Sequence, residues 1–206
     1  MPAPFAPRQG QLFAAMDQPI DRGPADLPLL ERQLREWQER LEAFQAPRFA
    51  AAGRSSGLSP GQGDLFGGPE QQGSAAVAEL DPLALVAQHL QFWRWPDQGP
   101  EGAALYFVLD RPPHLSGALL LYVGETGQAD RRWKGEHDCK RYLAAYGEAL
   151  RQAGLGSAPS IRFWRDAPAA VKPRRALEQA LIRHWLPPFN KETRGRWATP
   201  FTAEPD

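Results

Sequence analysis

Two tyrosines, Tyr106 and Tyr122, lie in apolar runs whose composition is typical of β-strands, at 105–109 and 119–123. The segment between the runs contains Pro112-Pro113, and prolines cannot donate to a strand ladder. The pattern therefore predicts a β-hairpin whose loop is longer than the tightest turns. A phenol donates or accepts hydrogen bonds, and it can lose its proton where nearby charges lower its pKa. Two such hydroxyls on neighbouring strands can point at a common spot.

Glu178 is the second candidate, in an apolar-periodic segment that predicts a helix over 174–185. Ile182 and Trp185 follow it at spacings of four and seven, so the carboxylate shares their core-facing side. A carboxylate in that position is costly unless it is paired or binds a metal ion. Two explanations stay open: a metal site, or an ion pair with Arg174 or Arg175.

The order of these residues resembles that of the GIY-YIG nuclease family. The first element of the signature reads Ala104-Leu105-Tyr106, with alanine in place of the usual glycine, and the second reads Tyr122-Val123-Gly124. Downstream, the matching positions are Arg132, Glu178 and, after two prolines, Asn190. The resemblance implies an α+β fold: a small domain with a mostly antiparallel three-stranded sheet flanked by helices.

The resemblance also implies hydrolysis of a phosphodiester with one divalent ion, Mg²⁺ or Mn²⁺, held by Glu178. In this mechanism Arg132 contacts the scissile phosphate, where its planar guanidinium matches the phosphate oxygens. Tyr122, or a base that Tyr122 positions, would deprotonate the attacking water, and Tyr106 would hydrogen-bond to the water or the phosphate. The amide of Asn190 would orient backbone or active-site groups, unless it only forms a turn after the prolines.

Two positions depart from the family pattern. Many members have lysine where this chain has Glu125, and a carboxylate there would raise the pKa of a tyrosine. Either Tyr122 is then not the base, or Glu125 acts as base or second metal ligand, or activity is weak. Many members also have His or Tyr one turn after the arginine, where this chain has Glu136. The adjacent His137 can replace it if the helix is shifted by one residue; otherwise His137 is a solvated side chain.

The charge distribution is uneven and suggests where a polyanion would bind. Residues 1–101 carry 8 basic and 13 acidic side chains, whereas residues 102–206 carry 16 and 11. The basic C-terminal half is the part that would meet DNA, although a mosaic of solvated charges is the alternative. The candidate phosphate contacts are Arg131, Lys134, Lys140, Arg141, Arg194 and Arg196. Trp197 and Phe201 would either stack on an unpaired base or close the core.

Two short peptides in the N-terminal region match Q-x-x-L-F. They are Gln9-Gly10-Gln11-Leu12-Phe13 and Gln62-Gly63-Asp64-Leu65-Phe66, both in Gly-rich surroundings. The pattern resembles the pentapeptide with which bacterial polymerases and repair proteins bind the sliding clamp, the apolar pair entering a pocket and the glutamine bonding at its rim. The predicted clamp-binding residues are therefore Gln9, Leu12, Phe13, Gln62, Leu65 and Phe66. The alternative is that the apolar pairs pin the linkers onto the domain.

The chain divides into four predicted segments. A disordered tail (1–25) precedes an amphipathic helix (26–46), a flexible linker (47–78) and the GIY-YIG-like domain (79–206). The helix is expected to end near Pro47 and either to dock on the domain, to pair with a copy of itself, or to bind another protein. If residues 1–75 are only tethers, their removal spares folding.

Within the domain, the expected elements are a short helix that begins at Asp81-Pro82, a helix over 129–152 that can break near Gly147, a strand over 160–165 and the helix over 174–185. The single cysteine, Cys139, excludes an internal disulfide and is expected to be a buried thiol. The sequence contains no apolar run long enough to span a bilayer and no signal-peptide pattern at its start. These features favour a cytoplasmic, nucleoid-associated protein with no membrane partner.

Together these observations predict a metal-dependent DNA endonuclease of repair, recombination or replication, recruited by the sliding clamp. The alternative from another functional class is a catalytically inactive adaptor that binds DNA or the clamp. A restriction-type nuclease is a third hypothesis, weakened because no target-recognition domain is evident.

Overall fold

The computed structural model describes residues 28–55, 77, 80–91, 102–129 and 138–201 of the chain. Its centre is a sheet of three antiparallel strands in the order β2-β1-β3. The strands are β1 (Ala104–Asp110), β2 (Leu119–Thr126) and β3 (Ser160–Trp164). Every residue of β1 is buried, as expected for a central strand covered on both faces. The predicted α+β class and antiparallel sheet are confirmed.

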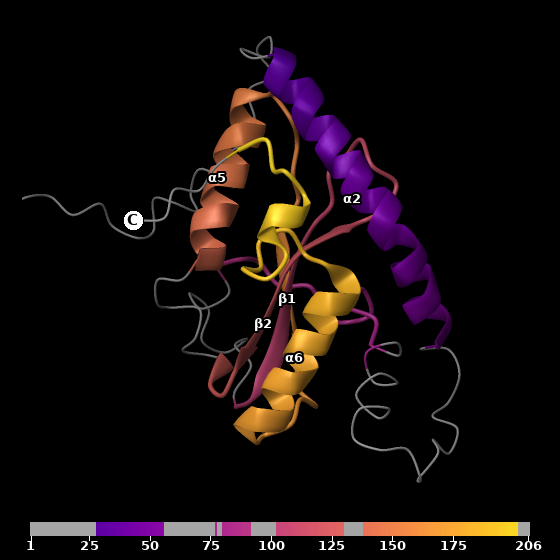
Figure 1. Cartoon of the computed structure of the whole chain (residues 1–206), viewed down its shortest axis with the longest axis vertical. Coiled ribbons are helices and arrows are strands. Elements are labelled where there is room, and N and C mark those ends of the chain that lie inside the picture. The colour runs from indigo at the N-terminus through magenta and orange to yellow at the C-terminus, as the bar shows by residue number, and fades with distance from the viewer. Residues whose placement is uncertain (1–27, 56–76, 78–79, 92–101, 130–137, 202–206) are drawn as a thin grey trace, which may run out of the picture.

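Helices cover both faces of this sheet (Figure 1). The helices α2 (Pro28–Ser55) and α5 (Asp138–Gln152) pack over one face, where they share a core with Tyr106 and Leu121. The helix α6 (Val171–Trp185) packs over the other face against Leu105 and Phe107. The C-terminal segment, with the short 3-10 helix η3 (Arg194–Arg196), runs back between α5 and α2 (Figure 1).

The register of the hairpin shifts between Val108 and Leu109, which leaves Leu121 as an extra residue in β2. Such a bulge changes the face to which the following side chains point. Beyond it, Tyr122 lies opposite Val108 and Gly124 lies opposite Tyr106. As a result, both tyrosines lie on the face covered by α2 and α5, whereas Val123 packs into the core beneath α6.

The N-terminal helix is longer than predicted and is part of the core. It passes through Pro47 and ends at Ser55 rather than near 46. An internal proline costs a helix about 3 kcal/mol. Burial of the Phe49 side chain against Trp185, with ring centroids 4.4 Å apart, contributes a similar amount. Tertiary packing therefore offsets the local preference of proline to end the helix.

Of the three possibilities for this helix, docking on its own domain is the one observed. Leu34, Trp37 and Leu41 are fully buried in the core shared with α5 and the sheet. Residues 28–55 are therefore not a tether, and the condition under which removal of residues 1–75 would spare folding is not met for them. The second peptide and its flanks, 56–76, lie outside the described residues, as does the tail 1–27.

The short helix predicted to begin at Asp81-Pro82 does not form. Residues 81–91 form turns and an isolated bridge between Gln88 and Ile161, and Val86 is 78% exposed. The Asp81 carboxylate accepts the Leu83 N–H at 2.8 Å, so the predicted cap exists without the helix. The physical reason is Arg162 of β3, whose guanidinium takes the carbonyls that a helix would use. It donates to the carbonyl oxygens of Pro82, Leu83 and Leu85.

The remaining elements lie close to their predicted positions. In the described part of 129–152, α5 runs from Asp138 to Gln152 without a break at Gly147. Cys139 is fully buried, as expected. The aromatic residues near the C-terminus close the core: Phe201 packs on Trp37 at 5.8 Å between ring centroids, and Trp197 donates its indole N–H to the Leu186 carbonyl. Among the helices that the structure describes, none has the length and apolarity needed to cross a membrane.

Candidate active site

The tyrosine pair lies at the end of the hairpin where β1 starts and β2 finishes. The rings of Tyr106 and Tyr122 are 5.9 Å apart between centroids and nearly parallel, with 28° between their planes. The ring of Tyr106 lies directly over the backbone of Gly124. A Cβ atom built on that glycine would be 2.3 Å from Cζ of Tyr106. Only glycine leaves room for the ring, which explains physically why a Tyr-x-Gly sequence occurs at this point of the strand.

The phenol of Tyr122 is not a base in this environment. Burial raises its pKa well above the ordinary value, and the neighbouring Tyr106, Cys139 and Glu178 add to the effect. Tyr122 therefore stays protonated at neutral pH. It can donate a hydrogen bond to a phosphate or a water, but it carries no phenolate to take a proton. Of the two predicted roles, positioning another base therefore suits this environment better than deprotonating the water.

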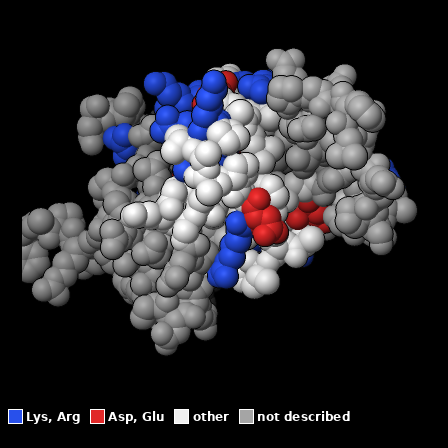
Figure 2. Space-filling view, turned by 90° about the horizontal axis from the view of Figure 1, so that it is seen from below, with Lys and Arg blue, Asp and Glu red and all other residues white. Residues whose placement is uncertain are grey.

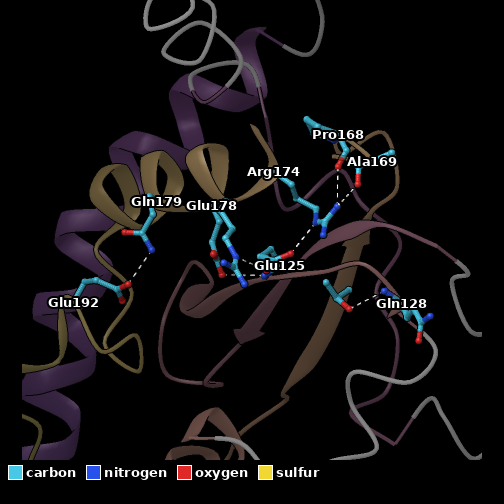
Figure 3. A network of polar contacts seen from close by, with 10 residues as sticks. Glu125, Gln128, Pro168, Ala169, Arg174, Glu178, Gln179 and Glu192 are labelled. Carbon is cyan, nitrogen blue, oxygen red and sulfur yellow. Dashed lines mark hydrogen bonds and ion pairs between the residues drawn. The ribbon is translucent and has the colours of Figure 1, made fainter. Parts of the chain in front are cut away.

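Glu178 reaches the same end of the sheet from α6. Its Oε1 atom accepts the backbone N–H of Glu125 at 2.9 Å, at the outer edge of β2 (Figure 3). Burial, followed by the charge of Glu125, raises the pKa of Glu178 to about 7. The charge of Glu192, which accepts a hydrogen bond from Gln179, acts in the same direction.

The alternative of an ion pair between Glu178 and Arg174 or Arg175 is wrong. Both arginines bind Glu125 instead: Nε of Arg174 is 2.7 Å from Oε2, and Nε of Arg175 is 3.2 Å from Oε1 (Figure 3). In the part of the chain that the structure describes, no lysine or arginine forms an ion pair with Glu178. This carboxylate is thus half-buried among other acids and has a single hydrogen-bond donor.

Glu125 has a different role from those proposed for it. Burial acts to raise its pKa, but the hydrogen bonds and charges of Arg174 and Arg175 outweigh burial and lower the pKa. Glu125 is therefore ionised, and both of its oxygens are occupied by guanidinium groups, so it is neither a free base nor an available metal ligand. Arg174 is itself fixed by the carbonyls of Pro168 and Ala169. Arg175 is 68% exposed and presents the rest of its guanidinium to solvent beside Glu178.

Asn190 holds the outer edge of β2. Its side-chain oxygen accepts the Val123 N–H at 2.9 Å, and its side-chain nitrogen donates to the Val123 carbonyl at 2.8 Å. The side-chain amide of Asn190 thus orients backbone, as predicted. The residue that it binds, Val123, lies between Tyr122 and Gly124. The same edge is covered further along by Gln45 of α2, which exchanges two hydrogen bonds with Leu120.

Sequence reasoning missed Gln45 and the role of Arg174. The signal for Gln45 was present, because it follows Leu41 by four residues on the apolar side of its helix. A buried glutamine on such a stripe needs backbone or side-chain partners, and an unpaired strand edge supplies them. Arg174 was weighed only as a partner of Glu178, since sequence spacing does not show which of two acids an arginine meets.

Several predicted residues lie outside the described residues. Arg132 and His137 are among them, and nothing in the geometry tests their roles. The same applies to the DNA contacts Arg131 and Lys134 and to the six clamp-binding residues, Gln9, Leu12, Phe13, Gln62, Leu65 and Phe66.

The other four predicted DNA contacts differ in how much of each side chain is available. Lys140 is only 6% exposed and offers little surface to a phosphate. Arg141 is half-buried, and Arg194 lies over the Tyr142 ring, with Cζ 4.3 Å from its centroid. Arg196 is exposed. Figure 2 shows basic side chains gathered along one border of the face seen from below, with acidic side chains nearer its centre.

The residues at this site fit a divalent cation. Glu178 is a hard oxygen ligand that forms no ion pair among the described residues, and burial and then the charge of Glu125 raise its pKa; a bound cation would stabilise its ionised form. Among the described residues, no group of three or more His, Cys, Asp or Glu side chains is arranged to bind a metal ion. A metal ion would therefore take one ligand from Glu178 and fill its other positions with water and substrate oxygens, as Mg²⁺ commonly does.

Comparison of the chain with protein-family models, with curated proteins and with solved structures found no significant match in any of the three.

Proposed function

We propose that the chain is a divalent-metal-dependent DNA endonuclease of the GIY-YIG type, recruited to DNA by the sliding clamp. One observation carries the proposal. Glu178 is a half-buried carboxylate with a pKa of about 7 and no basic partner among the described residues, and it lies at the end of a hairpin that also holds Tyr106 and Tyr122. A structural carboxylate would be paired at such a position, whereas a metal ligand has to remain available.

The roles of the chain's own groups follow from their geometry. Glu178 would hold Mg²⁺ or Mn²⁺, which supplies positive charge to the phosphate and to the leaving oxygen. Tyr122, protonated, would donate its hydroxyl hydrogen to a phosphate oxygen or to the water. Arg175, held by Glu125, would add a guanidinium on the solvent side of the site, and Arg132 is expected to add another. Asn190 and Gly124 would keep the strand and the Tyr106 ring in register.

The test is cleavage of branched, flapped, nicked and single-stranded DNA with Mg²⁺ or Mn²⁺. We expect Glu178→Ala to lower the rate by about 10³-fold, since a bound metal contributes several kcal/mol to such a reaction. Glu192→Gln is the matched control: it removes a neighbouring carboxylate that is engaged with Gln179, and it should retain activity. Equal rates for Glu178→Ala and the unaltered protein would exclude this site. A protein that binds DNA but cuts none of these substrates is the inactive adaptor.

Recruitment by the clamp is tested separately, with the purified bacterial sliding clamp. We expect Leu12→Ala/Phe13→Ala and Leu65→Ala/Phe66→Ala each to weaken binding, and the combination to abolish it. If both peptides engage one clamp, loss of either removes the avidity gain, which is on the order of 10²-fold or more. Binding that survives the combined substitution would remove the clamp from the proposal and leave the nuclease site unaffected.

A further inference from the structure

A second group of basic side chains lies away from Glu178, where α2, the end of α6 and η3 meet. Arg48 of α2 places its guanidinium over the Phe44 ring, with Cζ 3.6 Å from the centroid. Arg196 of η3 approaches the same ring, with Cζ 5.7 Å from the centroid. Trp197 also contacts that ring, with 5.5 Å between the centroids and 71° between the ring planes. Two guanidinium groups from distant parts of the sequence therefore share one aromatic support.

Arg48 is held in place by the backbone. Its Nε atom donates to the His184 carbonyl at 3.0 Å, and Nη1 donates to the Phe44 carbonyl at 2.6 Å. These bonds join α2 to the last turn of α6 and fix the plane of the guanidinium. In the described residues, the Nη2 atom makes no hydrogen bond, and neither Arg48 nor Arg196 forms an ion pair with a carboxylate.

Within the part of the chain that the structure describes, no carboxylate therefore compensates the positive charge of this group. Burial lowers the pKa of Arg48, and the charge of Arg196 lowers it further. Burial and then Arg48 also lower the pKa of His184. Like charges placed together without a partner raise the free energy of the folded chain, and an anion bound between them would remove that repulsion.

We propose that Phe44, Arg48 and Arg196 form a second phosphate-binding site, which holds the backbone of the DNA on which Glu178 acts. Backbone phosphate is favoured over a base because two guanidinium groups match phosphate oxygens, and because Arg48 already lies over the Phe44 ring on which a base would stack. His184 follows Glu178 by six residues on α6, about 9 Å along the helix axis, which a few nucleotides of one strand can span. The inference rests on the proposed function for the identity of the anion.

The test measures binding of a fluorescein-labelled duplex of mixed sequence to the full-length protein in EDTA, over a series of NaCl concentrations. Arg196→Gln and Arg48→Gln should each weaken binding, and each should reduce the slope of log K against log[salt] by about 0.9, the value for one lost phosphate contact. Arg183→Gln, an exposed arginine on α6 outside the group, is the matched control and should leave the slope unchanged.

Because Arg48 also joins α2 to α6, its replacement by glutamine can affect folding, so Arg48→Lys, which retains the charge, is tested beside it. Arg196 is exposed, so Arg196→Gln should leave the fold intact. Equal slopes for Arg196→Gln, Arg183→Gln and the unaltered protein overturn the inference, as does failure of the unaltered protein to bind the duplex. Because EDTA prevents cleavage, the two proposals fail separately. A changed slope in a protein that never cuts DNA supports this site and not the nuclease, whereas cutting with equal slopes supports only the nuclease.

Discussion

Two carboxylates at opposite ends of the hairpin differ in the number of hydrogen bonds that they accept. Asp110, the last residue of β1, is fully buried and accepts hydrogen bonds from the hydroxyls of Tyr146 and Ser157, at 2.7 and 2.9 Å, and from the Ala158 N–H at 2.7 Å. Glu178, at the other end, is half-buried and accepts one backbone N–H.

Both carboxyl groups have a raised pKa, with burial as the largest cause, but what surrounds them differs. The donors to Asp110 are Tyr146 of α5 and two residues of the loop before β3, Ser157 and Ala158. The Tyr146 hydroxyl in turn accepts a hydrogen bond from Gln38 of α2. These bonds tie together elements that are distant in sequence.

Around Glu178, the charges of Glu125 and Glu192 raise its pKa, and the charge of the exposed Arg175 offsets this only in part. Asp110 ties distant elements together, whereas Glu178 has no basic partner among the described residues, and this contrast supports the proposed role of Glu178 as a metal ligand.

The largest expected effect comes from removing α2, which supports the Asp110 end. Deletion of residues 1–75 should prevent folding, because it removes Leu34, Trp37 and Leu41 from the core together with Gln38. Deletion of residues 1–27 should leave the thermal midpoint close to that of the full chain. Circular dichroism melting of the two truncated proteins checks this. A cooperative transition in the shorter protein would show that α2 is dispensable after all.

The next effect is on Asp110 itself. Asp110→Ala leaves the hydroxyls of Tyr146 and Ser157 and the Ala158 N–H without their acceptor, and we expect a loss of about 3–5 kcal/mol in the free energy of unfolding. Urea denaturation measures it. Glu178→Ala, in parallel, should cost little or even stabilise the protein. If the two variants lose similar stability, the contrast between the two acids is wrong.

The pH dependence of stability sharpens the contrast. The folded-state pKa of Glu178, about 7, lies above its ordinary value of 4.5, so the folded state binds this proton more tightly than the unfolded state does. The stability contributed by this proton is fully present below pH 4.5 and is lost as the pH rises to 7; the loss is at most about 3 kcal/mol, because solvent screens this half-buried group. Urea titrations of the unaltered protein and of Glu178→Gln at several pH values isolate this term. The difference should grow with pH and shrink when Mg²⁺ is added.

The smallest effect concerns the edge of β2 beside the site. Asn190→Ala removes both hydrogen bonds to Val123 and should cost about 2 kcal/mol, with a further loss of cleavage because the register of Tyr122 depends on this strand. The matched variant is Gln45→Ala, which removes two bonds to Leu120 at the far end of the same edge. It should lower stability by a similar amount and leave the rate of cleavage of the folded protein unchanged. Equal losses of cleavage would show that the edge acts as one unit.

Sequence patterns were sufficient for the elements whose residues alternate or repeat on one face. The hairpin, β3 and α6 follow from such patterns and from prolines at their ends, and Gly124 is explained by the Tyr106 ring above it. Sequence patterns failed where a residue distant in the sequence determined whether a helix formed or where it ended. Pro47 would end an isolated helix, but the contact between Phe49 and Trp185 continues it. Asp81-Pro82 would start a helix, but Arg162 binds its carbonyls.

The candidate site shows the same division. Glu178, Tyr106, Tyr122 and Asn190 could be found from their spacing, because each one's position on its element is local information. The partners of Glu125 could not, because Arg174 and Arg175 are closer in sequence to Glu178 than to any other acid. Only the packing of α6 across β2 assigns them to Glu125.

The outer edge of β2 is covered along its length by side chains from other elements. Side chains from three separate segments, Gln45, Asn190 and Glu178, already satisfy backbone groups of this strand that would otherwise be open. A foreign peptide cannot add itself to the sheet on that side without first displacing all three, which protects the protein from strand-exchange aggregation.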